Sequence, residues 1–185
     1  MKKEESQVVG GTYADPSLSD KNALTTFGTE SWESLVARAT IKASDKVKPS
    51  PVGSEKTCTY SASNWGEPSR AKGAVVGCQN YFPVIYSAGD LDLTSGSGQG
   101  LLIVDGRLRI RGNFVFAGVI LVRDEFEAEG TMQLYGALVS RNEDGGDTKI
   151  SGNASLNYSA CAIDKAMGGQ SVPSRSKHRS WVQLF

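Results

Sequence analysis

Three aspartates in the middle of the chain are the residues best suited to chemistry. Asp90, Asp92 and Asp105 could supply the paired carboxylates that hydrolases and lyases acting on acidic polysaccharides use. Each of them, however, is followed by an arginine at a nearly constant interval along the chain. These arginines are Arg107, Arg109 and Arg123. We interpret the aspartates as ionised partners of the arginines, and expect no catalytic residues in this chain.

Other catalytic patterns are missing from the sequence. The one histidine, His178, lies in a basic segment at 174–179 that contains no acidic residue and no cysteine. The sequence therefore gives little support for a Ser-His-Asp or Cys-His site. The glycine-rich run 96–100 lacks the helix and lysine of a phosphate-binding loop, so we interpret it as a turn. A calcium site at Asp144 and Asp147 is conceivable, but we expect no metal and no cofactor.

The chain has three cysteines, Cys58, Cys78 and Cys161. The first two flank a polar loop, and a disulfide between them would close about 20 residues and stabilise the fold by about 3 kcal/mol. We predict the Cys58–Cys78 bridge, with two unrelated free thiols as the alternative. Cys161 is expected to be a buried small apolar residue. No CxxC pair is present, so zinc is not expected.

Charge and hydropathy exclude some partners. The 20 basic residues balance the 20 acidic ones, whereas nucleic acids and anionic membranes attract proteins with a basic excess. No apolar run approaches the roughly 18–20 residues of a membrane span, and the opening residues lack the apolar part of a secretory signal. The chain is therefore either cytosolic or a fragment without its export and anchor segment.

A repeat positions the charged residues. Gly100, Gly118 and Gly136 recur at a constant interval, and Asp105, Arg123 and Arg141 recur at the same one. Gly152 follows Gly130 at a longer interval, since a polar insert intervenes. An 18-residue repeat of three short strands predicts a mostly β fold, a short, triangular, parallel β-solenoid.

The second strand of each coil predicts the register. Its outward residues are acidic, then basic, then acidic, whereas an ordinary solvated face would show a random order of signs. The inward residues are Leu91 and Leu93, then Leu108 and Ile110, then Phe126 and Ala128. The outward charges are Asp90, Asp92, Arg107, Arg109, Arg111, Glu125, Glu127 and Glu129. Opposite charges on neighbouring strands attract, so we predict a charge ladder with arginines between two rows of carboxylates.

The first strand of each coil is continuously apolar, at 101–104, 119–122 and 137–139, which indicates burial on both faces. We expect it to be covered by a helix at 30–43, whose Trp32, Leu35, Val36 and Ala39 form one apolar stripe. Segment 160–167 is a second candidate, and an exposed interface is the alternative. A shorter helix is expected to end at Phe27, and 44–80 is expected to be irregular.

We predict one domain with three parts. Residues 1–80 form an extended segment, helices and the cysteine-bridged loop, all packed on the solenoid. Residues 81–160 form the β-solenoid, and residues 161–185 form a short helix and a tail.

Three stretches resemble a known family. They are GQGLLIVDG (98–106), GNFVFAG (112–118) and ISGNASLNYSACAI (150–163), and the RSW at 179–181 is also similar. Together they resemble the C-terminal ectodomain of PilX-type, type IV pilus-associated bacterial proteins. The resemblance implies an extracellular or cell-surface module, joined in that family to a pilin-like N-terminal helix that this chain does not contain. It assigns no functional residues.

These observations lead to an expected function and two alternatives. We expect a non-enzymatic structural or binding module, a minor pilin or adhesion component. Its partners would be other pilus or surface-assembly proteins, or a glycan or other surface ligand, and neither nucleic acid nor a membrane. The alternatives are a bactofilin-like, polymer-forming cytoskeletal protein and a carbohydrate-active β-helix protein.

Overall fold

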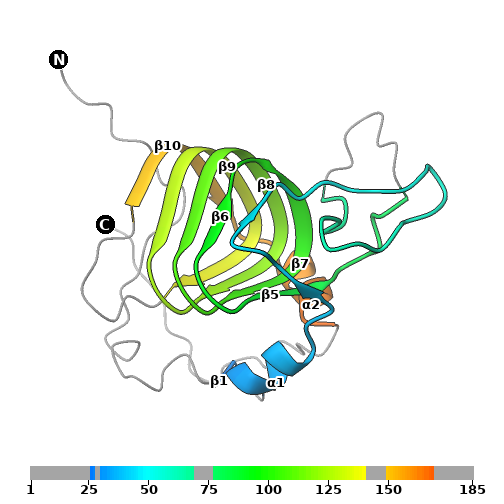
Figure 1. Cartoon of the computed structure of the whole chain (residues 1–185), viewed down its shortest axis with the longest axis horizontal. Helices are drawn as coiled ribbons and strands as arrows, with labels where there is room; N and C mark the ends of the chain where they lie inside the picture. The colour runs from blue at the N-terminus through cyan, green and yellow to red at the C-terminus, as the bar shows by residue number, and fades with distance from the viewer. Residues whose placement is uncertain (1–25, 28–29, 69–76, 141–148, 169–185) are drawn as a thin grey trace.

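The computed structural model describes residues 26–27, 30–68, 77–140 and 149–168. Its parallel strands wind into a β-solenoid, with two short helices beside it (Figure 1). The fold class predicted from the 18-residue repeat is therefore confirmed. No helix in these described ranges is long and apolar enough to cross a membrane.

The coils contain six strands. They are β5 (Val84–Ser87), β6 (Leu91–Leu93), β7 (Gly96–Val104), β8 (Leu108–Val122), β9 (Phe126–Ser140) and β10 (Lys149–Asn157). Leu91 pairs with Leu108, and Leu108 with Phe126, which is the register predicted for these coils. Gly130 pairs with Gly152, the longer step that was also predicted. The insert that causes this longer step, with Asp144 and Asp147, lies outside the described residues, as does His178.

Four strands are longer than the sequence analysis predicted, because β7 and β10, with 9 residues each, also run through a corner. Instead of breaking at each corner of the coil, β8 and β9 each continue for 15 residues. Glycines make this continuity feasible: Gly118 has φ of 144° and Gly136 has φ of 147°. A Cβ on Gly136 would collide with the carbonyl oxygen of Gly118, and one on Gly118 with that of Gly100. The glycine repeat therefore exists because each corner stacks directly on the corner of the previous coil.

A partial coil precedes the predicted ones. The strands β3 (Ile41–Lys42) and β4 (Lys46–Val47) pair in parallel with β5 and β6, placing Ile41 beside Ile85 and Lys46 beside Asp92. The solenoid thus begins at Ile41, within segments that the sequence analysis interpreted as helix and irregular chain. Such short strands cannot show an alternating pattern.

Apolar side chains fill the inside of the coils. The inward residues predicted for the second strand, among them Leu91, Leu108 and Phe126, are fully buried. Phe114 and Phe116 of β8 contribute from the third side, together with Met132 and Leu134 of β9. A second apolar cluster lies on the outer face of the first strands, where Leu101, Ile103 and Leu121 are buried under the helices.

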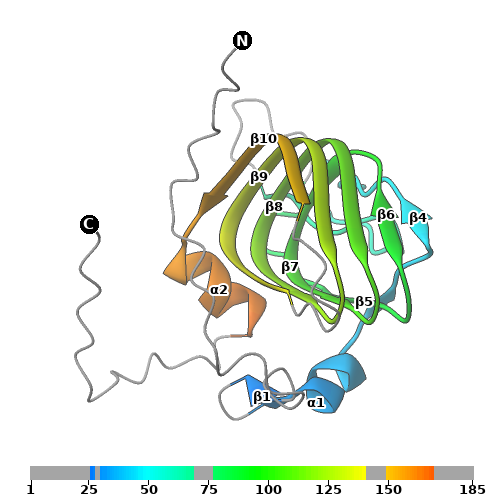
Figure 2. The same ribbon diagram turned by 90° about the vertical axis from the view of Figure 1, so that its left-hand side faces the viewer.

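The two helices cover this outer face (Figure 2). Trp32 and Leu35 come from α1 (Trp32–Ala37), and Ala166 comes from α2 (Ala160–Ala166). Both predicted covering segments are therefore in place, and the face is no free interface in the described part of the chain. The helix bounds 30–43 were wrong, because Ile41 is needed in the solenoid core, where it is 4% exposed.

The chain ahead of α1 also differs from the prediction. Glu30 and Ser31 form β2 (Glu30–Ser31), which pairs antiparallel with β1 (Thr26–Phe27). Phe27 thus belongs to a strand rather than to the end of a helix. Ser31 caps α1 by accepting a hydrogen bond from the Ser34 amide at 3.1 Å, a common way to begin a helix.

Candidate functional site

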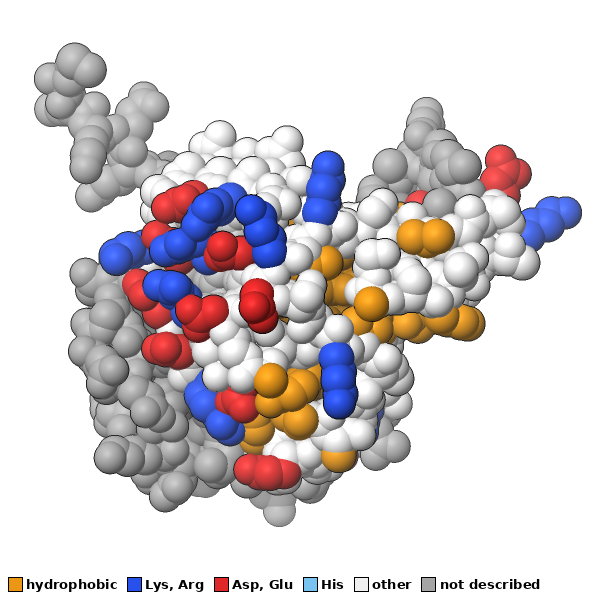
Figure 3. Space-filling model, in the orientation of Figure 1, with side chains coloured by type: hydrophobic (Ala, Val, Ile, Leu, Met, Phe, Trp, Pro, Cys, Tyr) orange, Lys and Arg blue, Asp and Glu red, His pale blue; other side chains and the backbone are white. Residues whose placement is uncertain are grey.

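The predicted charge ladder lies on one face of the solenoid (Figure 3). In strand register, Lys46, Asp92, Arg109, Glu127 and Lys149 stand side by side in one column. The sign alternates at every step, and neighbouring strands are about 4.8 Å apart. The structure thus brings the predicted rows together and adds a lysine at each end of this column.

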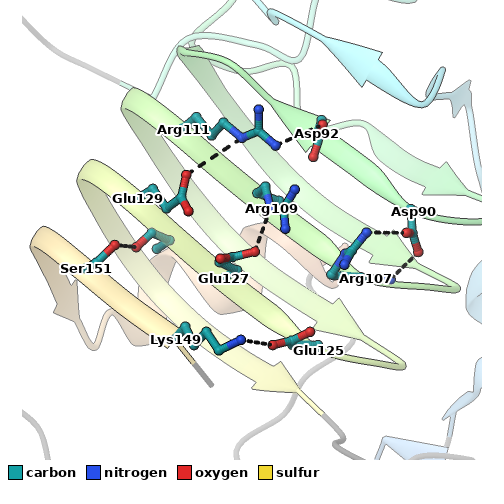
Figure 4. A network of polar contacts seen from close by, with 11 residues as sticks. Asp90, Asp92, Arg107, Arg109, Arg111, Glu125, Glu127, Glu129, Lys149 and Ser151 are labelled. Atoms are coloured by element: carbon teal, nitrogen blue, oxygen red, sulfur yellow. Dashed lines mark hydrogen bonds and ion pairs between the residues drawn. The ribbon is translucent and has the colours of Figure 1, made fainter. Parts of the chain in front are cut away.

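Ion pairs connect the rows (Figure 4). Arg107 Nη2 lies 2.9 Å from Asp90 Oδ2, and Arg109 Nε lies 2.5 Å from Glu127 Oε2. Arg111 reaches both ways, 3.7 Å to Asp92 and 3.8 Å to Glu129. Asp92 therefore pairs with Arg111, on the diagonal, although Arg109 is its neighbour in register.

Glu125, the outermost acidic residue of its row, pairs with the last coil. Its Oε1 lies 3.5 Å from Nζ of Lys149 in β10. The ion pairs therefore reach across every coil from β6 to β10.

The Arg109–Glu127 pair is the least exposed one in the ladder, with 25% and 12% of the two side chains accessible. The hydrogen bond from Arg109 lowers the pKa of Glu127 from its ordinary value of 4.5. The same hydrogen bond raises the pKa of Arg109. Glu127 therefore stays ionised at neutral pH, which suits a structural ion pair better than a proton-transfer group.

Asp105 is held in a separate cluster. Its carboxylate lies 2.5 Å from Nη1 of Arg123 and accepts a hydrogen bond from the Tyr86 hydroxyl at 3.1 Å. Arg123 in turn lies over the ring of Trp32, 4.5 Å from its centroid. Burial and the hydrogen bond to Asp105 both raise the pKa of Tyr86. This cluster links α1 to the coils.

The predicted disulfide is present between Cys58 and Cys78. The loop that it closes is packed on the solenoid rather than standing free. Trp65 is fully buried in the solenoid core, where Gly98 leaves room for it: a Cβ on Gly98 would lie 2.9 Å from the Trp65 Cβ. The sequence analysis did not predict that this tryptophan is buried, although a large aromatic side chain in an otherwise polar loop gains stability from burial.

Two amide side chains hold the bridged loop in place. Nε2 of Gln99 lies within hydrogen-bonding distance of the carbonyl oxygens of Cys78, Gln79 and Tyr81, at 3.2, 3.0 and 2.8 Å, and its two N–H groups are shared among them. Asn64 is fully buried, donates to the Thr59 carbonyl at 2.7 Å and accepts from the Gly66 amide at 3.0 Å. Displacing a buried amide that already forms hydrogen bonds is costly. The bridged loop is therefore held rigidly against the solenoid, and it forms one wall of the groove described next.

A groove of about 530 Å³ lies between this wall and α2. Its floor is the outer face of the third strands, with Val115 and Ala117 of β8 and Gln133 and Tyr135 of β9. This volume lies within the range of about 300–1,000 Å³ typical of ligand sites. Nothing in the sequence pattern indicated the groove, because its walls come from segments far apart in the chain.

The two walls contribute charged and aromatic groups to the groove. Glu67 and Phe82 come from the side of the bridged loop, and Cys161 and Lys165 from α2. Lys165 lies over the Phe82 ring, with Nζ 5.4 Å from its centroid, so the two walls touch there.

Cys161 is exposed and unbridged, so the prediction that it is buried was wrong. The side of α2 that packs on the coils carries Ile163, Ala166 and Met167. Position 161 is about 200° around a helix from position 163. Cys161 therefore lies on the other side and lines the groove.

No cluster of three or more His, Cys, Asp or Glu side chains suited to a metal ion occurs within the described ranges. Comparisons of the chain with protein-family models, with curated proteins and with solved structures found no match.

Proposed function

We propose that this chain is a non-enzymatic structural and binding module of a bacterial surface assembly, related to type IV pili. The observation that carries the proposal is the Cys58–Cys78 disulfide, anchored to the solenoid through Trp65 and Gln99. Disulfides persist outside the cytosol and are rare within it. The link to pili rests on the sequence resemblance, whose stretches include the stacked corner glycines and the start of α2.

The fold suits a rigid spacer. β8 and β9 pair along their whole length, so the coils cannot slide past one another without breaking this register. The ladder adds attraction between every pair of neighbouring rows. A module exposed to shear at a cell surface benefits from both features.

The carboxylates considered for catalysis support the non-enzymatic interpretation. Asp90, Asp92 and Asp105 each form an ion pair with an arginine. Each of these carboxylates is therefore engaged by a basic side chain of the fold itself.

The bactofilin-like alternative is disfavoured by the ends of the ladder. The column that contains Asp92 begins with Lys46 and ends with Lys149. End-to-end stacking of two copies in register would place lysine beside lysine, and like charges facing each other across strands repel.

The test is the location and redox state of the protein in its native cells. We expect the chain in the surface or sheared-filament fraction, with only Cys161 open to alkylation before reduction. A pool found only in the cytosol, with all three thiols reduced, would overturn the proposal. So would turnover of a polysaccharide by the purified protein that Asp105→Asn abolishes.

A further inference from the structure

The floor of the groove offers side chains only. β8 pairs with β7 on one side and β9 on the other, and β9 pairs in turn with β10, so the backbone groups of the floor are already used. A peptide strand could not add to this sheet here, because strand addition needs an unpaired edge. The floor instead presents the Gln133 amide and the Tyr135 ring, which is 42% exposed, beside the smaller Val115 and Ala117.

Glu67, in the wall of the groove, has a buried carboxylate oxygen without a hydrogen-bond donor in the described part of the chain. It is 9% exposed, and its Oε2 has no hydrogen-bond partner among the described residues. A buried carboxylate oxygen without a donor loses its hydration and gains nothing in return, which is costly. This oxygen has less than 1 Å² of accessible surface, so a donor in the groove reaches it when the Glu67 side chain turns outward. A ligand that brings a hydroxyl donor to the turned side chain would remove this cost.

The charges of the groove call for a ligand without net charge. Its lining has one acidic side chain, Glu67, and one basic one, Lys165. Lys165 already lies over Phe82. Neither an anionic nor a cationic ligand would find a cluster of opposite charge here.

Both walls of the groove are also held in place before any ligand binds. The disulfide and the hydrogen bonds of the Gln99 amide fix one wall, and the packing of Ile163 and Ala166 fixes α2. A rigid site avoids the ordering cost that weakens binding. Amides, a phenol and a carboxylate around an apolar floor match the alternating hydroxyl groups and C–H faces of a sugar.

We propose that this groove binds an uncharged oligosaccharide, with Tyr135 as the stacking surface and Glu67 Oε2 as the acceptor for a sugar hydroxyl. The inference deepens the proposed function by naming a ligand class. It rests on the groove itself and not on where the protein resides, so binding by purified protein can fail while surface location holds, and the reverse.

Cys161 serves as a built-in reporter, because it lines the groove and is the one unbridged cysteine of the three. The purified chain is alkylated with iodoacetamide in the presence of neutral hexasaccharides of glucose, galactose, mannose or N-acetylglucosamine. At about ten times Kd, we expect at least one of these sugars to slow alkylation about tenfold. Polygalacturonate and a mixture of unstructured peptides are the competing probes.

Variants separate a groove ligand from a non-specific effect. Glu67→Gln keeps the shape of the side chain, and we expect it to weaken binding of the protecting sugar about tenfold. Tyr135→Ala, on the exposed face, should do the same by removing the ring. Tyr60→Ala removes a 72% exposed ring outside the groove lining and should leave affinity within about twofold. Thermal unfolding of each variant confirms that it is folded.

Three results would overturn the proposal. The first is that none of the neutral sugars protects Cys161 at about 10 mM, a concentration that would reveal even weak sites. The second is protection by polygalacturonate or by the peptides alone. The third is equal loss of affinity in Tyr60→Ala and Tyr135→Ala.

Discussion

Lys46 lies directly beside Asp92, in the parallel pairing of β4 with β6. This strand pairing places a lysine at the start of a column that ends with another lysine, Lys149, beside Glu127. Between them the charges alternate through Arg109. The ladder is therefore a property of the whole solenoid, including its first partial coil, and a change at any one position should be felt by the coils on both sides.

Reversing the central charge should destabilise the fold. In Arg109→Glu, the new carboxylate would stand between Asp92 and Glu127, so two attractions become two repulsions. We expect the midpoint of thermal unfolding to fall by about 3–6 °C. Lys48→Glu, at an exposed position outside the strands, is the matched control. An equal fall in both variants would show that the register carries no special stability.

Acid should weaken the contribution of the Arg109–Glu127 ion pair to the stability of the fold. The pKa of Glu127 is lower in the folded chain than its ordinary value of 4.5. The pair therefore stabilises the fold fully above pH 4.5, and this stability is lost as the pH falls through the folded pKa. The difference in free energy of unfolding between wild type and Glu127→Gln should be largest near neutral pH and shrink in acid.

Urea unfolding between neutral pH and pH 3 measures that difference. Glu55→Gln, at an exposed position just ahead of the bridged loop, is the control, and its effect should stay small throughout. A gap between wild type and Glu127→Gln that persists unchanged at pH 3 would contradict the role of this ion pair.

Opening the disulfide should loosen one wall of the groove. Cys58 and Cys78 are 20 residues apart in sequence, and losing a bridge of this span costs about 3 kcal/mol in the chain-entropy model. We expect the Cys58→Ser, Cys78→Ser double variant to lose this amount in urea unfolding. Cys161→Ser should unfold like wild type, because that thiol is exposed and unbridged. Comparable losses in the two proteins would mean that the bridge adds nothing.

A corner glycine should not tolerate a side chain. Gly118→Ala would force a Cβ against the Gly100 carbonyl oxygen at a φ of 144°. We expect a loss of about 3 kcal/mol or more, or failure to fold, because the backbone of two coils would have to separate. Gly89→Ala meets nothing within 4 Å and should change stability by less than about 1 kcal/mol. Soluble yield and thermal unfolding of both variants provide the measurement.

The solenoid and most of the ladder could be predicted because their information is local and repeated. Gly118 and Gly136 recur at one interval, and the alternation around Arg109 specifies which side chains face outward. Any slip by one residue would turn the charges into the core. The Cys58–Cys78 bridge was also within reach, since both cysteines flank one polar loop.

The remaining features depended on contacts between distant segments. The helix at α1 ends early because Ile41 is drawn into the core beside Ile85, and no pattern within 30–43 contains that information. Cys161 has an apolar neighbourhood in the sequence, yet the rotation of α2 turns it outward into the groove. The sequence by itself therefore determined the repeating coil and its register. The tertiary structure alone decided where the coil begins, how the helices lie on it and which side chains line the groove, because these depend on packing between residues that are far apart in the chain.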